Sequence, residues 1–291
     1  MVTDRSIHPP LILLVAALVA AAGGCAQLGT VTDGTSLARG YCNDGHLVDG
    51  VRLPKQGDGY LIPPIWTKRG NNFGTDELVS IVVRAARRVQ SEAPGSELYV
   101  GDFSQPAGGQ SPFHRSHQTG RDADLIFFAL DADGQPQRVP NGMYRFGDDG
   151  WTRRPPRLHF DVVREWLLVR ALLEDPGVDV QHLFISAPLR QMLLDHAEEL
   201  GEPRELVERA RLVLQQPVDA LPHDDHLHVR IFCPVSDRAL GCRDRGPLRW
   251  FKKTYKYLTA RKLVATLPDE VRDQMLRPFC SFLVAVTVAR L

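Results

Sequence analysis

Two short segments that lie far apart in the sequence each concentrate histidine. Five of the ten histidines fall in HRSHQTGRDAD, at 114–124, and PHDDHLHV, at 222–229. Catalytic zinc sites commonly use three protein ligands, drawn from neutral imidazole and carboxylate, and keep one position open for water. His117, Asp124 and His228 can supply such a set. The fold must therefore bring the two segments together.

The second segment runs into a predicted strand, HLHVRIF, at 226–232. Side chains alternate between the two faces of a strand, so His226 and His228 project from one face while Leu227 and Val229 project into the core. One of the two histidines can then bind a metal ion while the other reaches the metal's water.

A single histidine is more often a surface or packed residue than a ligand, so the joint arrangement carries the prediction. In the first segment, Gly120 stands between His117 and Asp124. A glycine permits a tight turn, which would bring the loop back over the start of the next strand.

The remaining elements favour an α+β fold, a compact single domain around a central antiparallel sheet with flanking helices. Apolar residues recur at helical spacing over Glu77–Ala93, with Thr75 and Asp76 as possible caps. Further helices are predicted at 161–174, 189–200 and 203–214, and further strands at 97–103, 124–130 and 182–186. The Gly-, Pro- and Asp-rich segment 131–158 is predicted to be a surface excursion beside the site.

Residues 1–25 have the pattern of an export signal. An apolar run, Leu11–Ala22, is shorter than the roughly 20 residues that span a membrane, and small residues follow it before Cys25. This resembles a bacterial lipobox, and it predicts a periplasmic protein anchored by lipid on Cys25. Plain secretion with cleavage nearby is the alternative. Residues 26–36 are predicted to be a tether, and 37–291 the folded domain.

Cysteine usage and charge fit an exported protein that does not bind nucleic acid. Besides Cys25 there are four cysteines, an even number that suits two disulfides, although four buried thiols are the alternative. Cys233 and Cys242 are close enough for a local loop, which leaves Cys42 to reach Cys280. Lys plus Arg equals Asp plus Glu, at 35 each, so no net field attracts nucleic acid.

The histidine segments resemble the penicillin-insensitive murein endopeptidases. That family belongs to a wider group of zinc peptidases with lysostaphin-like enzymes and D-alanyl-D-alanine carboxypeptidases. The group's motif is a histidine, six residues, an aspartate and a distant His-x-His, matched here by His117, Asp124, His226 and His228. The segments that resemble the endopeptidase branch are GDFSQPAGG at 101–109, His114 ahead of SHQTG, DAD at 122–124 and HDDHLHVRIFCP at 223–234.

The resemblance, which extends over about residues 36–250, implies a role for each site residue. His117, Asp124 and His228 would bind Zn²⁺, His226 would be the catalytic base or polariser, and His114 and His223 would line the site. It also supports the pairing of Cys42 with Cys280. The implied substrate is the cross-linked peptide stem of peptidoglycan, cut at the D-alanyl-meso-diaminopimelyl bond.

Three features depart from the family. Arg121 replaces a usual hydrophobic residue and is expected to alter the rim of the site. The excursion at 131–158 and the basic segment at 252–262 also differ. The basic segment is either a solvated cationic helix or a binding site for anionic wall polymer.

Two alternative functions remain open from the sequence. A zinc D,D-carboxypeptidase or dipeptidase would trim uncross-linked stems with the same metal. A catalytically inactive murein-binding lipoprotein would keep the fold without turnover. The chain contains no SxxK, KTG or GxSxG motif, which argues against a serine enzyme and predicts insensitivity to β-lactams.

Overall fold

The computed structural model describes residues 36–138, 142–218 and 220–246. The predictions for the export signal, for Cys25, for nearly all of the tether, for Cys280 and for the basic segment 252–262 lie outside these residues. The chain divides into two units, 1–244 and 245–291, and every element below belongs to the first. In the described part, no helix combines the length and apolar character needed to cross a membrane.

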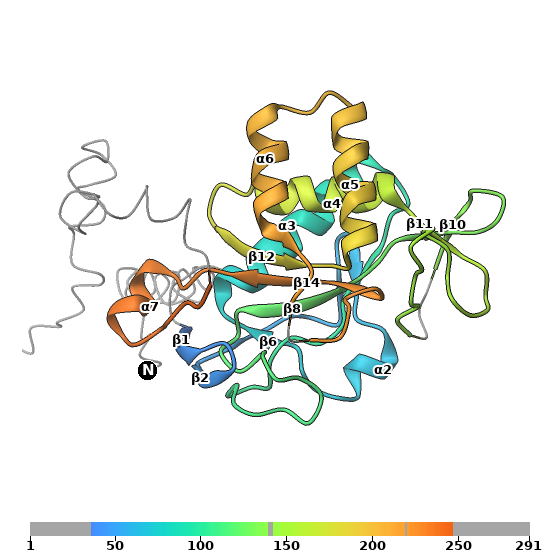
Figure 1. Cartoon of the computed structure of the whole chain (residues 1–291). Coiled ribbons are helices and arrows are strands. Elements are labelled where there is room, and N and C mark those ends of the chain that lie inside the picture. The colour runs from blue at the N-terminus through green and yellow to red at the C-terminus, as the bar shows by residue number, and fades with distance from the viewer. Residues whose placement is uncertain (1–35, 139–141, 219, 247–291) are drawn as a thin grey trace, which may run out of the picture. The chain divides into compact units, whose positions relative to one another are not determined.

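Helices and strands follow one another irregularly, as the sequence predicts for an α+β fold (Figure 1). The helices are α2 (Pro64–Thr67), α3 (Asp76–Glu92), α4 (Val162–Leu173), α5 (Ala187–Glu199), α6 (Arg204–Val213) and α7 (Val235–Ala239). The strands are β1 (Leu37–Tyr41), β2 (Asp44–Val48), β3 (Val51–Arg52), β4 (Gln56–Gly57), β5 (Tyr60–Leu61), β6 (Phe73–Gly74), β7 (Leu98–Tyr99), β8 (Asp122–Ile126), β9 (Ala129–Leu130), β10 (Pro136–Gln137), β11 (His159–Phe160), β12 (Val180–Phe184), β13 (Leu214–Gln215) and β14 (His226–Ile231).

The central sheet has the strand order β13-β12-β14-β8. β14 lies antiparallel to both of its neighbours, which confirms the predicted antiparallel centre. The edge strand β13 is parallel to β12, because α5 and α6 form the crossover between them. The pairing of β8 with β14 aligns the two histidine segments side by side.

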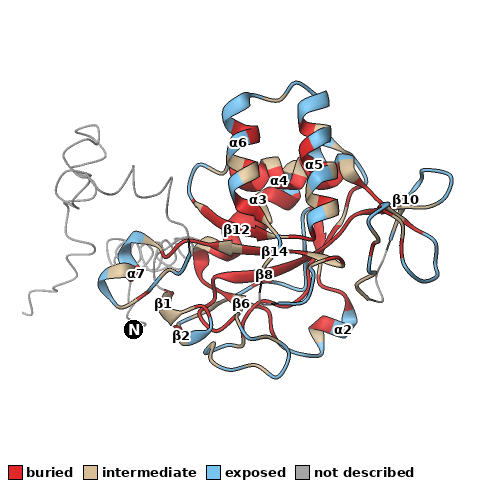
Figure 2. Cartoon of the chain, in the orientation of Figure 1, coloured by how far each residue is buried: buried red, intermediate tan, exposed pale blue. Residues whose placement is uncertain are grey.

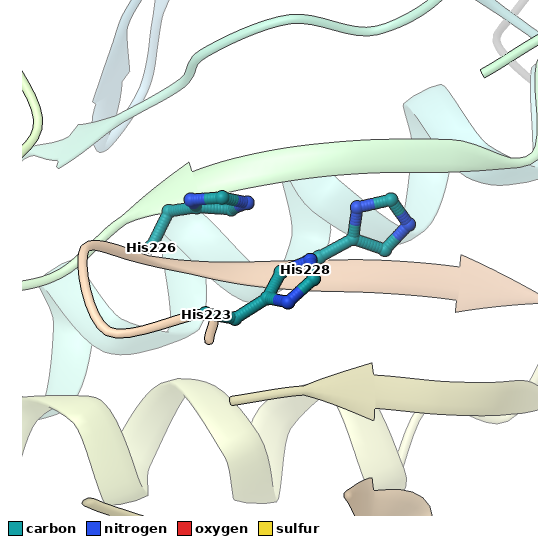
Figure 3. A group of neighbouring side chains, drawn as sticks. All are labelled: His223, His226 and His228. Atoms are coloured by element: carbon teal, nitrogen blue, oxygen red, sulfur yellow. The ribbon is translucent and has the colours of Figure 1, made fainter. Parts of the chain in front are cut away.

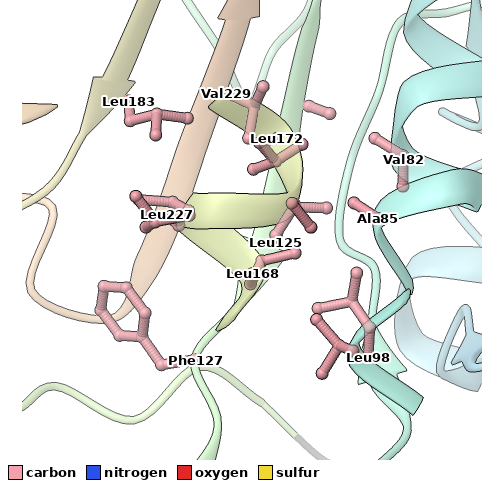
Figure 4. Close-up of a cluster of buried hydrophobic side chains, with 14 of the residues drawn as sticks. Val82, Ala85, Leu98, Leu125, Phe127, Leu168, Leu172, Leu183, Leu227 and Val229 are labelled. Atoms are coloured by element: carbon pink, nitrogen blue, oxygen red, sulfur yellow. The ribbon is translucent and has the colours of Figure 1, made fainter. Parts of the chain in front are cut away.

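The helices α3, α4, α5 and α6 cover one face of this sheet, and the buried residues concentrate between the two layers (Figure 2). Leu125 of β8 and Leu227 of β14 point toward Leu168 and Leu172 of α4 (Figure 4). All four side chains are fully buried. Burying a leucine is worth about 1.5–3 kcal/mol, so this layer holds the two site-bearing strands against the helices.

Helix α3 confirms its prediction closely. The Thr75 hydroxyl accepts a hydrogen bond from the Leu78 amide over 3.3 Å and so caps the first turn. Asp76 in that turn complements the helix dipole. The apolar residues on the inner face are buried, namely Leu78, Ile81, Val82, Ala85 and Val89. Helices α4, α5 and α6 likewise fall within two residues of their predicted bounds.

The strand predicted at 97–103 is much shorter in the structure, because the sheet pairing is interrupted. After β7, the Gly101 amide donates to the Asp124 carbonyl at 2.8 Å, and the Asp124 amide donates to the Asp102 carbonyl at 3.0 Å. Two residues thus oppose one, as in a β-bulge. The bulge ends the pairing and places Asp102 and Phe103 beside the candidate site.

The segment 131–158 forms the predicted surface excursion (Figure 1). Among its described residues, the regular structure consists of β10, which pairs with β9, and of bridges from Phe146 to Thr152 and from Trp151 to His159. The Phe146 amide donates to the Asp224 carbonyl at 2.8 Å. The excursion therefore contacts the loop that carries the second histidine segment.

The described chain ends in a disulfide loop. Cys233 and Cys242 are bonded, as predicted. The loop docks on β1 through backbone hydrogen bonds from Gly40 to Gly241 and from Arg243 back to Gly40. Cys42 is buried, and its pairing with Cys280 stays a prediction, because that cysteine lies outside the described residues.

Candidate functional site

All six predicted site residues lie together at the pairing of β8 with β14. His228 stands directly opposite Asp124 in the register, and His226 stands opposite Ile126. Figure 3 shows the His226 and His228 rings along β14, with His223 from the preceding loop beside them. The His223 ring centroid lies 4.9 Å from that of His226 and 5.5 Å from that of His228.

The Asp124 carboxylate is the centre of the cluster. Its Oδ1 atom lies 3.0 Å from His228 Nδ1 and 3.3 Å from His117 Nε2. The same oxygen lies 3.3 Å from His226 Nε2. His114 Nδ1 is 3.7 Å from the other carboxylate oxygen. One buried oxygen therefore faces three imidazole nitrogens.

The second nitrogen of two of these rings is occupied elsewhere. His117 Nδ1 donates to the Phe103 carbonyl over 3.1 Å, and His228 Nε2 donates to Asp122 Oδ1 over 2.8 Å. Both partners can only accept, so those nitrogens carry the protons. The lone pairs of His117 Nε2 and His228 Nδ1 then point toward Asp124. This is the arrangement that outer hydrogen bonds impose on metal-binding histidines.

A cation fits the centre of the cluster. Within the described residues, His117 Nε2 and Asp124 Oδ1 are both buried without a hydrogen-bond partner. Burial disfavours charge on His226 and His117, yet the Asp124 carboxylate outweighs it and raises the pKa of both, that of His226 to about 10. Burial also opposes ionisation of Asp124, but the histidines hold its pKa well below the usual range. The site thus favours positive charge beside Asp124, and three nitrogen and oxygen donors suit Zn²⁺.

His226 and His223 are held differently from the candidate ligands. His226 Nδ1 bonds Asp225 Oδ1 at 2.6 Å, which aims Nε2 at the centre. The His223 carbonyl accepts from the Ser186 amide at 2.7 Å, while its Nδ1 atom is buried with no partner among the described residues. Burial, then the positive charges of His228 and His226, lower the pKa of His223 to about 3. His223 is therefore a neutral ring at the site.

His114 is positioned by a buried carboxylate. Its Nε2 atom lies 2.8 Å from Asp102 Oδ2, and the same oxygen accepts from Arg69 Nη1 at 2.6 Å. The His114 ring lies against that of His117, with 4.2 Å between the centroids. Asp102 is fully buried, so it fixes His114 at the edge of the cluster.

The predicted turn before Asp124 is present. Gly120 has φ +74°, and a Cβ there would lie 2.7 Å from the Leu47 side chain and 2.9 Å from the Thr75 amide nitrogen. Only glycine fits such a position. His117 also has a positive φ of +66°, a conformation that costs a non-glycine residue on the order of 1–3 kcal/mol. The packed turn imposes it, and it directs the imidazole inward.

Sequence reasoning missed the carboxylates that support the histidines. Asp122 accepts from His228 and also from Arg230 Nε at 2.6 Å. Burial opposes its ionisation, but Arg230 and His228 hold its pKa far below the usual range. The available signal was the alternation of the strand, because Asp122 and Asp124 are two apart and share a face.

The loop before His226 is held by the excursion. The Asp224 side chain is almost fully buried and accepts from Arg145 Nε at 2.8 Å, with Arg153 Nε at 3.6 Å. The two arginines are joined by a backbone hydrogen bond of 2.8 Å. Segment 131–158 thus supports the second histidine segment directly.

The prediction that Arg121 lies at the rim is wrong. Its side chain is 1% exposed and ties the start of β8 to the disulfide loop. Nη1 donates to Asp244 Oδ1 at 2.8 Å and to the Ile231 carbonyl at 3.1 Å, and Nη2 donates to the Arg243 carbonyl at 3.0 Å. A buried guanidinium is tolerated because these acceptors replace its water.

Comparison with known proteins identifies the family of this chain. The family described as penicillin-insensitive murein endopeptidase matches residues 38–252. A protein of that name from Klebsiella pneumoniae (strain 342) is 27% identical over 244 residues, covering 81% of this chain and 82% of the relative. One from Salmonella paratyphi B is 29% identical over 266 residues, covering 86% of each. One from Salmonella newport is 30% identical over 216 residues, covering 73% of this chain and 71% of the relative. The chain belongs to the penicillin-insensitive murein endopeptidase family.

Proposed function

We propose that this protein is a zinc-dependent murein DD-endopeptidase that hydrolyses the D-alanyl-meso-diaminopimelyl cross-links of peptidoglycan. The observation that carries the proposal is the convergence of His117 Nε2 and His228 Nδ1 on Asp124 Oδ1, at 3.3 and 3.0 Å. Support also comes from relatives that are named murein endopeptidases.

In this proposal His117, Asp124 and His228 hold Zn²⁺. Two imidazoles and one carboxylate leave a coordination position for water, as in catalytic zinc sites. The hydrogen bonds from His117 to Phe103 and from His228 to Asp122 keep both rings in the required tautomer. When bound, zinc would supply a Lewis acid and lower the pKa of water to about 7.

The neighbouring histidines supply the proton transfers. His226 Nε2 faces the centre and is held by Asp225, so His226 takes the proton of the attacking water and passes it to the leaving amine. His223 lies beside His226 and can donate a ring N–H to the developing oxyanion, while His114, whose Nε2 atom faces Asp102, would line the site next to His117. Loss of an oxyanion donor typically costs about 10²–10³ in rate.

A periplasmic location is consistent with a peptidoglycan substrate. The export pattern of residues 1–25 supports a periplasmic protein, and lipid on Cys25 would hold it at a membrane beside the wall. The disulfide between Cys233 and Cys242 suits an oxidising compartment. The excursion would form one wall of a groove that accepts a stem on each side of the cut bond.

Purified cross-linked dimeric muropeptide tests the function directly. The zinc-loaded protein should convert dimers to monomers, a chelator should stop the reaction, and penicillin should have no effect. Release of only free D-alanine from uncross-linked pentapeptide stems would instead identify a carboxypeptidase. Binding to murein without any product would identify the inactive lipoprotein.

A further inference from the structure

A pocket lies beside the candidate site, at the end of β8. It is formed by the turn after α3, by the end of β8 and by the excursion strand β10. The lining residues that matter below are Glu97, Tyr99, Ile126, Arg138 and Arg164. None of them belongs to the metal and histidine cluster described above, so the pocket is a separate feature of the same region.

The strand register places the pocket next to the histidines. Val100 and Leu125 form an isolated antiparallel bridge, so Tyr99 lies opposite Ile126. Ile126 is in turn the register partner of His226. Tyr99, Ile126 and His226 therefore occupy matching positions on three adjacent segments and share one face of the sheet. Strands lie about 4.8 Å apart, so the Tyr99 and His226 backbones are separated by about 10 Å.

The pocket is lined by a carboxylate group, Glu97, that has an unsatisfied oxygen. Glu97 Oε2 is buried and makes no hydrogen bond within the described residues. The Tyr99 hydroxyl lies near this carboxylate, because burial and then the charge of Glu97 raise the pKa of Tyr99. A buried carboxylate oxygen without a partner is costly, so an ammonium group from a ligand would be favoured there.

The pocket also offers a positive group. Arg138 is exposed on the pocket wall, close enough to Tyr99 to act on its hydroxyl electrostatically. The other arginine, Arg164, is already held by Asp161 at 2.5 Å and by the Ala129 carbonyl at 2.9 Å. Arg138 is therefore the cation that can receive a ligand carboxylate.

We propose that this pocket binds a side chain that ends in both an ammonium and a carboxylate group, with Glu97 receiving the ammonium and Arg138 the carboxylate. The inference rests on the proposed function. In a D-alanyl-meso-diaminopimelyl cross-link, the donor stem carries such a group, the free amino-acid centre of its own diaminopimelyl residue. That residue precedes the D-alanine whose carbonyl is attacked.

The reach is consistent with this assignment. Consecutive Cα atoms are about 3.8 Å apart, and the diaminopimelyl side chain extends further from there. Together they can cover the roughly 10 Å between the His226 and Tyr99 positions. An apolar ligand would leave the Glu97 carboxylate unpaired, and a simple anion would be repelled by the charge of that carboxylate. Both are disfavoured relative to a zwitterion.

Three variants of the full zinc-loaded protein test the pocket, namely Glu97→Gln, Arg138→Gln and the double variant. Two substrates are compared, the natural dimer and a dimer whose donor diaminopimelyl residue is replaced by lysine, which lacks the carboxylate. Glu208→Gln and Arg39→Gln, both exposed and outside the pocket, are the matched controls. Zinc content and thermal unfolding establish that each variant is folded.

On the natural dimer, each pocket variant should raise KM about tenfold while kcat stays within about twofold. On the lysine dimer, Glu97→Gln should still raise KM, whereas Arg138→Gln should have no effect. Wild-type KM for both pocket variants on the natural dimer would overturn the proposal. Equal losses from Arg138→Gln on both substrates would overturn the role of the carboxylate.

Binding of the uncross-linked tetrapeptide monomer separates this inference from the proposed function. The monomer keeps the free diaminopimelyl centre and contains no bond to be cut. Its equilibrium affinity, measured by titration calorimetry, should fall about tenfold in each pocket variant. If the wild-type protein fails to cleave dimers but the pocket variants still bind the monomer about tenfold more weakly than the wild type, the proposed function is wrong and the pocket assignment is supported. Unchanged affinity of the pocket variants for the monomer would contradict the pocket assignment, whether or not the protein cleaves dimers.

Discussion

His228 Nε2 donates a hydrogen bond of 2.8 Å to Asp122, a residue 106 positions earlier in the chain. Asp122 also accepts a hydrogen bond from Arg230 Nε. These two interactions keep the Asp122 carboxylate ionised although it is fully buried. The bond leaves His228 Nδ1 as the nitrogen that faces Asp124. Asp122 therefore decides which atom of His228 is available to a metal ion.

Replacing Asp122 with asparagine should weaken zinc binding by about 10- to 100-fold, the usual worth of such an outer hydrogen bond. The asparagine keeps the shape but loses the charge that fixes the tautomer. Competition with a chelator of known affinity measures the change. Asp133→Asn, on an exposed turn of the excursion, is the control. Unaltered zinc affinity in Asp122→Asn would remove Asp122 from the site.

Alanine at any of His117, Asp124 or His228 should abolish stable zinc binding, because a site of three protein ligands rarely survives the loss of one. Zinc per chain after dialysis is the measurement. Full stoichiometric zinc in all three variants would show that the ligands lie elsewhere.

His226→Ala should behave in the opposite way. It should keep its zinc and lose about 10²- to 10⁴-fold in the rate of dimer cleavage, which is the usual contribution of general acid–base help. Metal content and turnover are measured on the same preparation. Normal turnover would mean that His226 is a bystander, and loss of zinc would make it a ligand.

Arg121→Met should destabilise the fold, because it leaves the buried Asp244 without one of its two cations. Removing one partner of a buried ion pair costs about 3–5 kcal/mol, and here Arg238, 2.7 Å from Asp244, should offset part of that. Denaturant unfolding gives the free energy. The double variant Arg121→Met with Asp244→Asn should lose less than the sum of the single variants. Additive losses would show that the two residues are uncoupled.

Glu165 should make the fold less stable as the pH rises. Burial, together with the charge of Asp161, raises the pKa of this carboxyl from 4.5 to about 8. The hydrogen bond from the Phe128 amide and the charge of Arg164 act in the opposite direction but are outweighed. Between pH 4.5 and about pH 8 the unfolded chain releases this proton while the folded protein keeps it. The free energy of unfolding therefore falls through this window, by on the order of 3 kcal/mol at pH 7.

Glu165→Gln has no proton to release, so its unfolding free energy should depend less on pH and exceed that of the wild type at pH 8. Denaturant unfolding at pH 5, 6, 7 and 8 measures the slope. Glu208→Gln, on the exposed side of α6, should keep the wild-type slope. Parallel pH profiles for wild type and Glu165→Gln would show that Glu165 is ionised in the folded protein.

Local patterns were sufficient to predict most of the regular structure. The spacing of Leu78, Ile81 and Val82 predicts α3, and Thr75 predicts its start, because helix period and capping depend on residues within a few positions. In the same way, the alternation of His226 and His228 with Leu227 and Val229 predicts which face of β14 is polar, and Gly120 predicts the turn.

Contacts between distant segments could not be predicted in this way. The strand expected at 97–103 ends early because Gly101 and Asp102 both oppose Asp124, and a bulge of this kind depends on the partner strand. Arg121 replaces a usual hydrophobic residue of the family and was expected to alter the rim, whereas its side chain is buried. Its acceptors, Asp244 and the Ile231 carbonyl, lie more than 100 residues later.

The sequence by itself determined the fold class, the main helices and the Cys233–Cys242 pair, because each leaves a periodic or spaced pattern along the chain. Spacing also pointed to His117, Asp124, His226 and His228, while His114 and His223 were added by the family resemblance. Only the tertiary structure decided which nitrogen of each histidine faces Asp124, which carboxylates support the rings, and that Glu97 and Arg138 line one pocket. These depend on the register of β8 against β14 and of the 98–100 segment against β8. Register is set by packing across the whole sheet, and a shift of one residue would turn every side chain to the other face.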